Sequence, residues 1–113
     1  MSYYTRVRFD FSDGPPEIDE VSAIVRSWLS DQNYDVEDKL DDFVRGWAPE
    51  GETDFCGLCS EDIEDLMINV SSHYPDFVFY VRGMGEEFGD VWLRAFEGGK
   101  VTFTLGPFPQ APG

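Results

Sequence analysis

Apolar and polar residues alternate over the first eleven positions, and this two-residue period predicts a β-strand with one buried face. One side of the strand carries Tyr3, Thr5, Val7, Phe9 and Phe11, and the other carries Tyr4, Arg6, Arg8 and Asp10. The segment Asp13-Gly14-Pro15-Pro16 ends the strand. Because proline is well tolerated in a first helical turn, a helix is expected to follow directly.

The apolar period then lengthens to that of a helix. A first helix is predicted over about residues 16–30, and its apolar positions are Ile18, Val21, Ile24, Val25, Trp28 and Leu29. A second is predicted over about residues 36–45, with Asp35 as its N-cap. Its apolar positions are Val36, Leu40, Phe43, Val44 and Trp47.

A third helix is predicted to begin after Ser60, because a serine hydroxyl can cap the free N–H groups of a helix start. Its inner positions are Ile63, Leu66, Met67 and Val70, and Pro75 ends it. The segment over residues 48–59, between the second and third helices, is predicted to be a loop.

The last third of the chain has the pattern of strands, predicted over residues 77–82, 91–96 and 101–105. Residues 83–89 are predicted to be a loop. Gly98 and Gly99 predict a tight hairpin between the last two strands, because glycine readily adopts the positive φ that such turns need. Residues 106–113 contain three prolines and are expected to form an extended tail.

The predicted order is β-α-α-α-β-β-β, which is typical of an α+β fold. Strands joined by hairpins imply an antiparallel sheet, and the apolar face of that sheet must be covered. We therefore expect a four-stranded antiparallel sheet with the helices on one face. A single α+β domain is expected over residues 1–105, followed by the Pro-rich tail of residues 106–113.

Acidic residues dominate the charge of the chain, with 23 Asp and Glu against eight Lys and Arg and a net charge of −15. Phosphate backbones and anionic membranes repel such a chain. The expected partner is therefore a basic protein surface, with no direct binding to nucleic acid or membrane. The excess is concentrated, since residues 31–65 contain thirteen acidic residues and only two basic ones.

Two acidic stripes are predicted on the second and third helices. Asp38, Asp41 and Asp42 have the i, i+3, i+4 spacing of one helix face, and Glu61, Glu64 and Asp65 repeat it. The intervening loop adds Glu50, Glu52 and Asp54. We interpret these nine residues as a partner-binding surface that imitates the charge of nucleic acid. A face that merely keeps the chain dissolved, and adaptation to high salt, are the alternatives.

Cys56-Gly57-Leu58-Cys59 precedes a predicted helix, as the paired thiols of thioredoxin-like redox sites do. Here an acidic segment comes before the pair, and nearby carboxylates should raise the pKa of a thiol. A structural zinc site needs four ligands, and His73 is the only other His or Cys. Two incidental thiols are the favoured interpretation, and no metal or cofactor is expected.

Other motifs fit known sites only in part. Glu50, Glu52, Asp54 and Glu61 match positions 1, 3, 5 and 12 of a calcium-binding EF-hand loop, but Phe55 replaces its required glycine. Residues 83–89 are rich in glycine but are predicted to join two strands, unlike a nucleotide-binding loop. The alternative for this segment is a set of catalytic carboxylates, formed by Glu86, Glu87 and Asp90. No nucleophile pairs recognisably with His73, so the chain is not expected to be an enzyme.

Residues 74–101 contain a distinctive series of aromatic, glycine and acidic positions. The series is Tyr74-Pro75-Asp76, Phe79, Gly83-x-Gly85-Glu86-Glu87-x-Gly89-Asp90-x-Trp92, Phe96 and Gly99-Lys100. It resembles the C-terminal segment of small uncharacterised bacterial, phage and plasmid proteins, and residues 2–7 are similar to the start of some of them. The resemblance implies a mobile-element context and carries no known activity or site residues.

These patterns together predict a non-enzymatic, nucleic-acid-mimicking inhibitor of the anti-CRISPR or anti-restriction type. The first residues lack the apolar core of a signal peptide, and the longest apolar run, residues 77–81, is too short to span a bilayer, so a cytoplasmic location is expected. The alternatives are an accessory α+β domain with an unknown protein partner and a metal or redox role for the Cys56/Cys59 segment.

Overall fold

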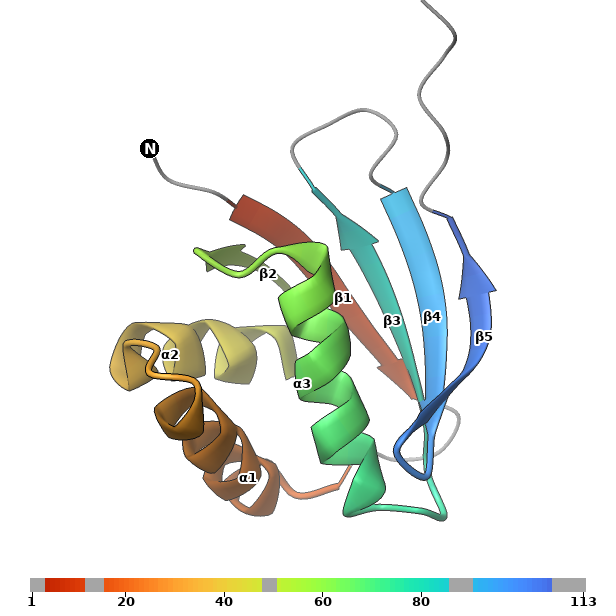
Figure 1. Cartoon of the computed structure of the whole chain (residues 1–113), viewed down its shortest axis with the longest axis horizontal. Helices are drawn as coiled ribbons and strands as arrows, with labels where there is room; N and C mark the ends of the chain where they lie inside the picture. Colours follow the sequence, from red (N-terminus) through yellow and green to blue (C-terminus); the bar gives the residue numbers. More distant parts are fainter. Residues whose placement is uncertain (1–3, 12–15, 48–50, 86–90, 107–113) are drawn as a thin grey trace, which may run out of the picture.

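The structure, a computed structural model, describes residues 4–11, 16–47, 51–85 and 91–106. Within these residues five strands form one antiparallel sheet, and three helices lie on one face of it (Figure 1). The elements are β1 (Tyr4–Phe11), α1 (Ile18–Asp31), α2 (Val36–Trp47), β2 (Glu52–Cys56), α3 (Ser60–Ser72), β3 (Val78–Met84), β4 (Val91–Glu97) and β5 (Lys100–Leu105). The predicted α+β class is confirmed.

The sheet has one strand more than predicted, and the element order differs accordingly. Strand β2 lies in the segment predicted to be a loop and pairs with β1, from Tyr4 opposite Cys56 to Arg8 opposite Glu52. Thr53 and Phe55 are buried, whereas Glu52 and Asp54 are exposed. The segment thus has the alternation of a half-buried strand, but only over five residues.

The strand order across the sheet is β2-β1-β3-β4-β5. Val7, Gly83 and Trp92 are neighbours across β1, β3 and β4 on the face toward the helices. A Cβ on Gly83 would lie 2.1 Å from Cζ2 of Trp92, so only glycine lets the indole ring lie against β3. Strand β3 continues through Met84, so the loop predicted to start at Gly83 starts later than expected.

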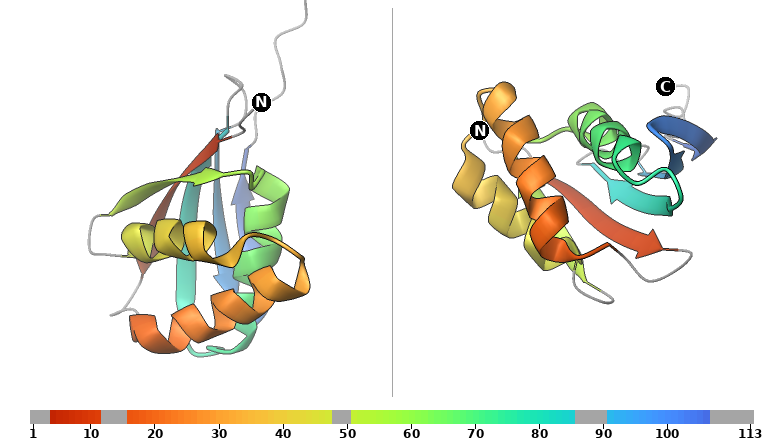
Figure 2. Two further views of the ribbon diagram at one scale, coloured as in Figure 1. Left: turned by 90° about the vertical axis from the view of Figure 1, so that its left-hand side faces the viewer. Right: turned by 90° about the horizontal axis from the view of Figure 1, so that it is seen from below.

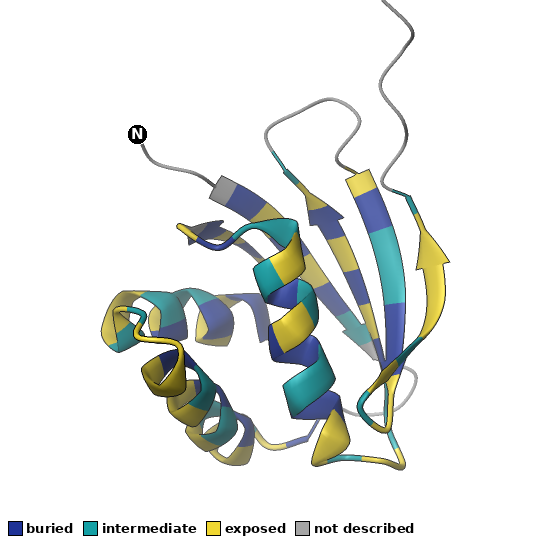
Figure 3. Ribbon diagram, viewed as in Figure 1, coloured by how far each residue is buried: buried dark blue, intermediate teal, exposed yellow. Residues whose placement is uncertain are grey.

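The helices cover the sheet unequally. Helix α2 packs on β1 and β2, α3 packs on β3, β4 and β5, and α1 packs against both of these helices (Figure 2). Side chains that face one another across these contacts are buried, whereas the outer sides of the helices are exposed (Figure 3). Phe43 and Trp47 on α2 pack on Phe9 of β1, with ring centroids 5.2 and 5.4 Å away. Val44, predicted to be an inner residue, is 40% exposed.

The start of α3 differs from the prediction by one residue. Cys59, not Ser60, occupies the N-cap position, and its backbone N–H donates to Oδ2 of Asp62 at 3.1 Å. The Ser60 hydroxyl instead accepts a hydrogen bond of 2.8 Å from the indole nitrogen of Trp92. The predicted hairpin is confirmed, with φ of 58° at Gly98 and 82° at Gly99.

Candidate functional site

Charge is divided between the two layers of the molecule. Residues 17–47 and 60–72, which contain the three helices, include thirteen acidic and three basic residues. The five strands include four acidic and five basic residues. We call the helical side the acidic helical layer, and it carries most of the negative charge of the described chain.

Helix α2 presents its acidic stripe on the side opposite its buried residues. Asp38 and Asp41 are exposed, whereas Leu40 and Phe43 are buried. The side chain of Asp42 is only 17% exposed, and its carboxylate accepts a hydrogen bond of 3.1 Å from Arg45. Asp38 and Asp41 are therefore the members of this stripe that solvent or a partner reaches most freely.

Helix α3 divides its acidic stripe between solvent and sheet. Glu61 and Asp65 are exposed. Glu64 instead forms an ion pair of 2.8 Å with Arg94 on β4, whose side chain is only 14% exposed. The Arg94 guanidinium also lies 4.8 Å from the centre of the Trp92 ring. Glu64 thus helps to hold α3 on the sheet, and its charge is largely compensated.

The starts of α2 and α3 lie close together in the acidic helical layer. The ammonium group of Lys39 is 5.5 Å from the ring centre of Tyr34, and a Cβ on Gly57 would lie 3.5 Å from that ammonium nitrogen. Burial, followed by the carboxylate of Asp62, raises the pKa of the Tyr34 hydroxyl. Lys39 therefore places one positive charge between the segments that lead into the two helices.

Two of the nine predicted partner-binding residues lie on the opposite side of the sheet from the helical stripes. Glu52 and Asp54 project from β2 on the face of the sheet away from the helices, because they alternate with the buried Thr53 and Phe55. Asp54 there forms an ion pair of 3.0 Å with Arg6. Glu50 lies outside the described residues. The other six residues lie on the helical side of the sheet.

The partial calcium motif does not form an EF-hand loop. Strand β2 occupies the middle of the motif, so Glu52 and Asp54 lie on the sheet while Glu61 lies on α3. Within the described residues, no group of three or more His, Cys, Asp or Glu side chains could hold a metal ion. Glu86, Glu87 and Asp90 lie outside those residues.

The Cys59 thiol is in the opposite electrostatic setting from a redox-active cysteine. It donates a hydrogen bond of 3.1 Å to the Asp62 carboxylate. Burial, together with that carboxylate, raises the pKa of the thiol, whereas redox sites lower it. The predicted direction of the pKa shift is confirmed for Cys59, and this setting favours a neutral thiol.

The role of Arg94 was missed in the sequence. A signal for it exists, since Trp92, Arg94 and Phe96 alternate along β4 and therefore point to the same face. An arginine on the covered face of a sheet needs a partner, because an unpaired buried charge is costly. An acidic residue on the covering helix is the natural partner, and Glu64 takes that role.

Comparison of the chain with family models, curated proteins and solved structures found no match. The resemblance over residues 74–101 therefore stays a prediction. Among the described helices, none combines the length and the apolar composition that crossing a membrane requires.

Proposed function

We propose that this chain is a non-enzymatic interaction protein whose acidic helical layer binds a basic groove in place of nucleic acid. One observation supports the proposal above all others: thirteen acidic residues against three basic ones in the helical segments, beside strands with four and five. Solubility depends on the net charge and not on where the charges lie. Solubility alone therefore does not explain why the acidic residues are concentrated in one layer.

The contacts would come from Asp38, Asp41, Glu61 and Asp65, which project from two helices on the same side of the sheet. Neighbours at i, i+3 and i+4 on a helix lie roughly 5–6 Å apart, comparable with successive phosphates along a strand. Complementary charge chiefly increases the rate and the specificity of association. The target would be a nucleic-acid-binding protein, such as a CRISPR nuclease or a restriction enzyme, inhibited on behalf of a mobile element.

Charge reversal tests the proposal. The variant Asp38→Lys, Asp41→Lys, Glu61→Lys, Asp65→Lys should remain folded, because exposed substitutions seldom cost more than about 0.5 kcal/mol each. The readout is displacement of a fluorescent DNA duplex from a panel of purified RNA-guided nucleases and restriction endonucleases. The native chain should displace the duplex from at least one of them. The variant should need about tenfold more protein or worse, because exposed ion pairs contribute about 0.2–1 kcal/mol each.

A second variant with the same change in net charge provides the control. Glu52→Lys, Asp54→Lys, Asp76→Lys, Glu97→Lys alters four exposed acids outside the acidic helical layer, and it should displace DNA nearly as well as the native chain. Equal loss in both variants would show that net charge acts without a defined surface. Failure of the native chain to displace DNA from every enzyme would favour the accessory domain with another protein partner.

A further inference from the structure

The face of the sheet away from the helices carries an apolar patch. Six large apolar side chains are strongly exposed among the described residues, and five of them lie on this face at 38–52% exposure: Tyr80, Met84, Val91, Phe103 and Leu105. The sixth, Val44, lies on α2. Single exposed apolar residues are ordinary on a protein surface, but a contiguous group marks an interaction site.

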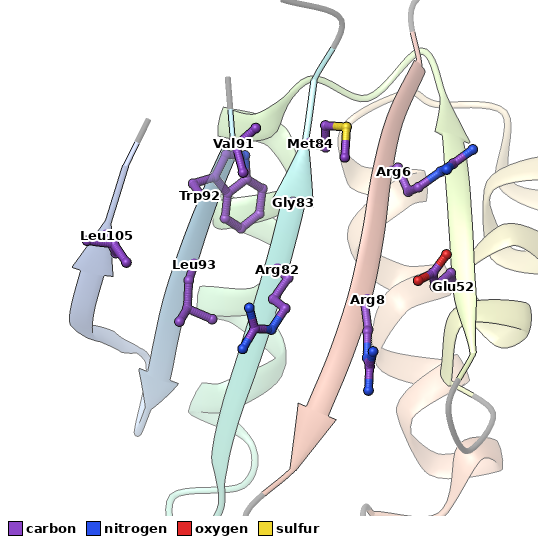
Figure 4. Close-up of a pocket in the computed structure, with 10 residues that line it drawn as sticks. All are labelled: Arg6, Arg8, Glu52, Arg82, Gly83, Met84, Val91, Trp92, Leu93 and Leu105. Carbon is purple, nitrogen blue, oxygen red and sulfur yellow. The ribbon is translucent and has the colours of Figure 1, made fainter. Parts of the chain in front are cut away.

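The strand register makes this patch continuous across β3, β4 and β5. Met84 lies opposite Val91, Leu93 opposite Leu105, and Ala95 opposite Phe103. A hollow of about 330 Å³ opens on the same face (Figure 4). Its apolar wall comes mainly from β4 and β5, and the arginines on β1 and β3 form its other side.

The polar side of this face carries balanced charge, in contrast to the acidic helical layer. Arg6, Arg8 and Arg82 are matched by Asp10, Glu52 and Asp54. The ion pairs measure 3.0 Å between Arg6 and Asp54, 3.3 Å between Arg8 and Asp10, and 3.6 Å between Arg82 and Asp10. The face therefore has an apolar part over β3, β4 and β5 beside a polar part of balanced charge over β2, β1 and β3. Apolar contact area together with neutral polar groups is the composition of a protein–protein interface.

We propose that this open face packs against the same face of a second copy, forming a two-fold dimer. A two-fold interface brings the same patch of both subunits together, so the charges of that patch must not repel their own copies. A face of balanced charge satisfies that condition. A basic partner would instead be drawn to the acidic helical layer. The inference is independent of the proposed function, although such a dimer would leave both acidic layers free.

The geometry of this dimer also limits the repulsion between two chains that each carry a charge of −15. Packed sheets lie about 10 Å apart, and helices lie about as far from the sheet that they cover. The two acidic layers would therefore be roughly 30 Å apart on opposite outer sides. That separation exceeds the screening length of about 8 Å at physiological ionic strength several times over.

Sedimentation equilibrium of the full chain over a range of concentrations tests the proposal. A dimer should form, and its dissociation constant should fall as NaCl is raised from about 0.05 to about 0.5 M, because salt screens charge repulsion but does not weaken apolar contact. Binding of a basic partner to the acidic helical layer should weaken over the same range. The opposite salt responses separate this proposal from the proposed function.

Substitutions locate the interface. Phe103→Asp and Leu105→Asp change side chains that are 50% and 52% exposed, and each should raise the dissociation constant at least about tenfold. Val44→Asp introduces the same charge at a residue that is 40% exposed on α2 and should leave it unchanged. Circular dichroism checks folding, and Met84→Asp on β3 replaces any β5 variant that does not fold. A monomer under all conditions, or equal weakening by Val44→Asp, would overturn the proposal.

Discussion

Cys59 and Asp62 show how one acidic neighbour sets the chemistry of a side chain. A thiol at a helix start would ordinarily have a lowered pKa, because the helix dipole stabilises a thiolate there. At the start of α3 the Asp62 carboxylate accepts hydrogen bonds from both the backbone N–H and the thiol of Cys59. Burial and this negative charge outweigh the dipole and raise the pKa of the thiol.

Alkylation in a Cys56→Ser background, where Cys59 is the remaining thiol, measures this effect. The pH midpoint of the iodoacetamide reaction should lie above that of free cysteine, about 8.5. Asp62→Asn should lower the midpoint, because it removes the negative charge. Since the folded pKa is the higher one, the stabilisation from the neutral thiol is complete below the unfolded pKa and is lost as pH rises through the folded pKa.

Two results would contradict this account of Cys59. One is a midpoint at or below that of free cysteine, which would restore the redox hypothesis. The other is a midpoint that Asp62→Asn leaves unchanged, because burial alone would then explain the shift. Urea unfolding of the Cys56→Ser chain, measured beside the native chain, controls for any loss of structure caused by the background substitution.

Among the elements, α2 approaches β2 closely because it carries Gly46 at the contact. A Cβ on Gly46 would lie 2.8 Å from Cγ2 of Thr53 and 3.1 Å from Cε2 of Phe9. Glycine inside a helix costs about 1 kcal/mol relative to alanine. Its presence in α2 is explained by the close approach that buries Thr53 and the neighbouring Trp47.

Gly46→Ala should therefore destabilise the chain although alanine favours helices. Forcing a methyl group into a packed contact costs about 1–3 kcal/mol, which exceeds the gain of about 1 kcal/mol in helix propensity. Urea unfolding measures the change. Adding Thr53→Ser removes the obstructing methyl group and should recover part of the loss. A more stable Gly46→Ala chain would mean that α2 and β2 separate at little cost.

The same contact shows why most elements could be predicted from sequence and β2 could not. The three helices and the strands β1 and β3 have apolar periods that reflect the core they bury, and the Gly98-Gly99 turn marks the hairpin of β4 and β5. Strand β2 has five residues, two of them acidic, so its two inward positions at Thr53 and Phe55 were too few to stand out. Missing β2 also placed Glu52 and Asp54 with the helical acids, from which the sheet separates them.

For the molecule as a whole, the unequal distribution of charge distinguishes a surface suited to a basic partner from one suited to a second copy of the chain. The acidic stripes could be predicted from spacing, because i, i+3 and i+4 positions share a helix face. The alternation along β4 indicates that Arg94 needs an acidic partner on a covering helix, but it does not identify Glu64, since this contact joins residues thirty positions apart. The open apolar face was likewise missed, because each strand contributes only two or three of its exposed residues and the register alone brings them together.

Because its like charges repel one another, the acidic helical layer should make the chain more stable as the salt concentration rises. Like charges at i, i+3 and i+4 destabilise a helix by about 0.2–0.5 kcal/mol per pair, so several pairs on α2 and α3 amount to about 1 kcal/mol. Raising NaCl from about 0.05 to about 0.5 M screens these pairs. The free energy of unfolding should rise by about that amount, measured with urea because guanidinium is itself a salt.

A neutralised variant ties this salt response to the acidic helical layer. Asp41→Asn, Asp65→Asn removes one charge of the stripe on each helix beyond the first turn, where the helix dipole would favour it. This variant should be more stable than the native chain at low salt and should respond less to added NaCl. Both chains are measured with Phe103→Asp, so that self-association makes no contribution. The exposed ion pairs, such as Arg6 with Asp54 and Arg26 with Glu37, are screened too and oppose the effect. A stability that falls with salt would show that these ion pairs outweigh the repulsion, and the acidic layer would then carry no strain for a partner to relieve.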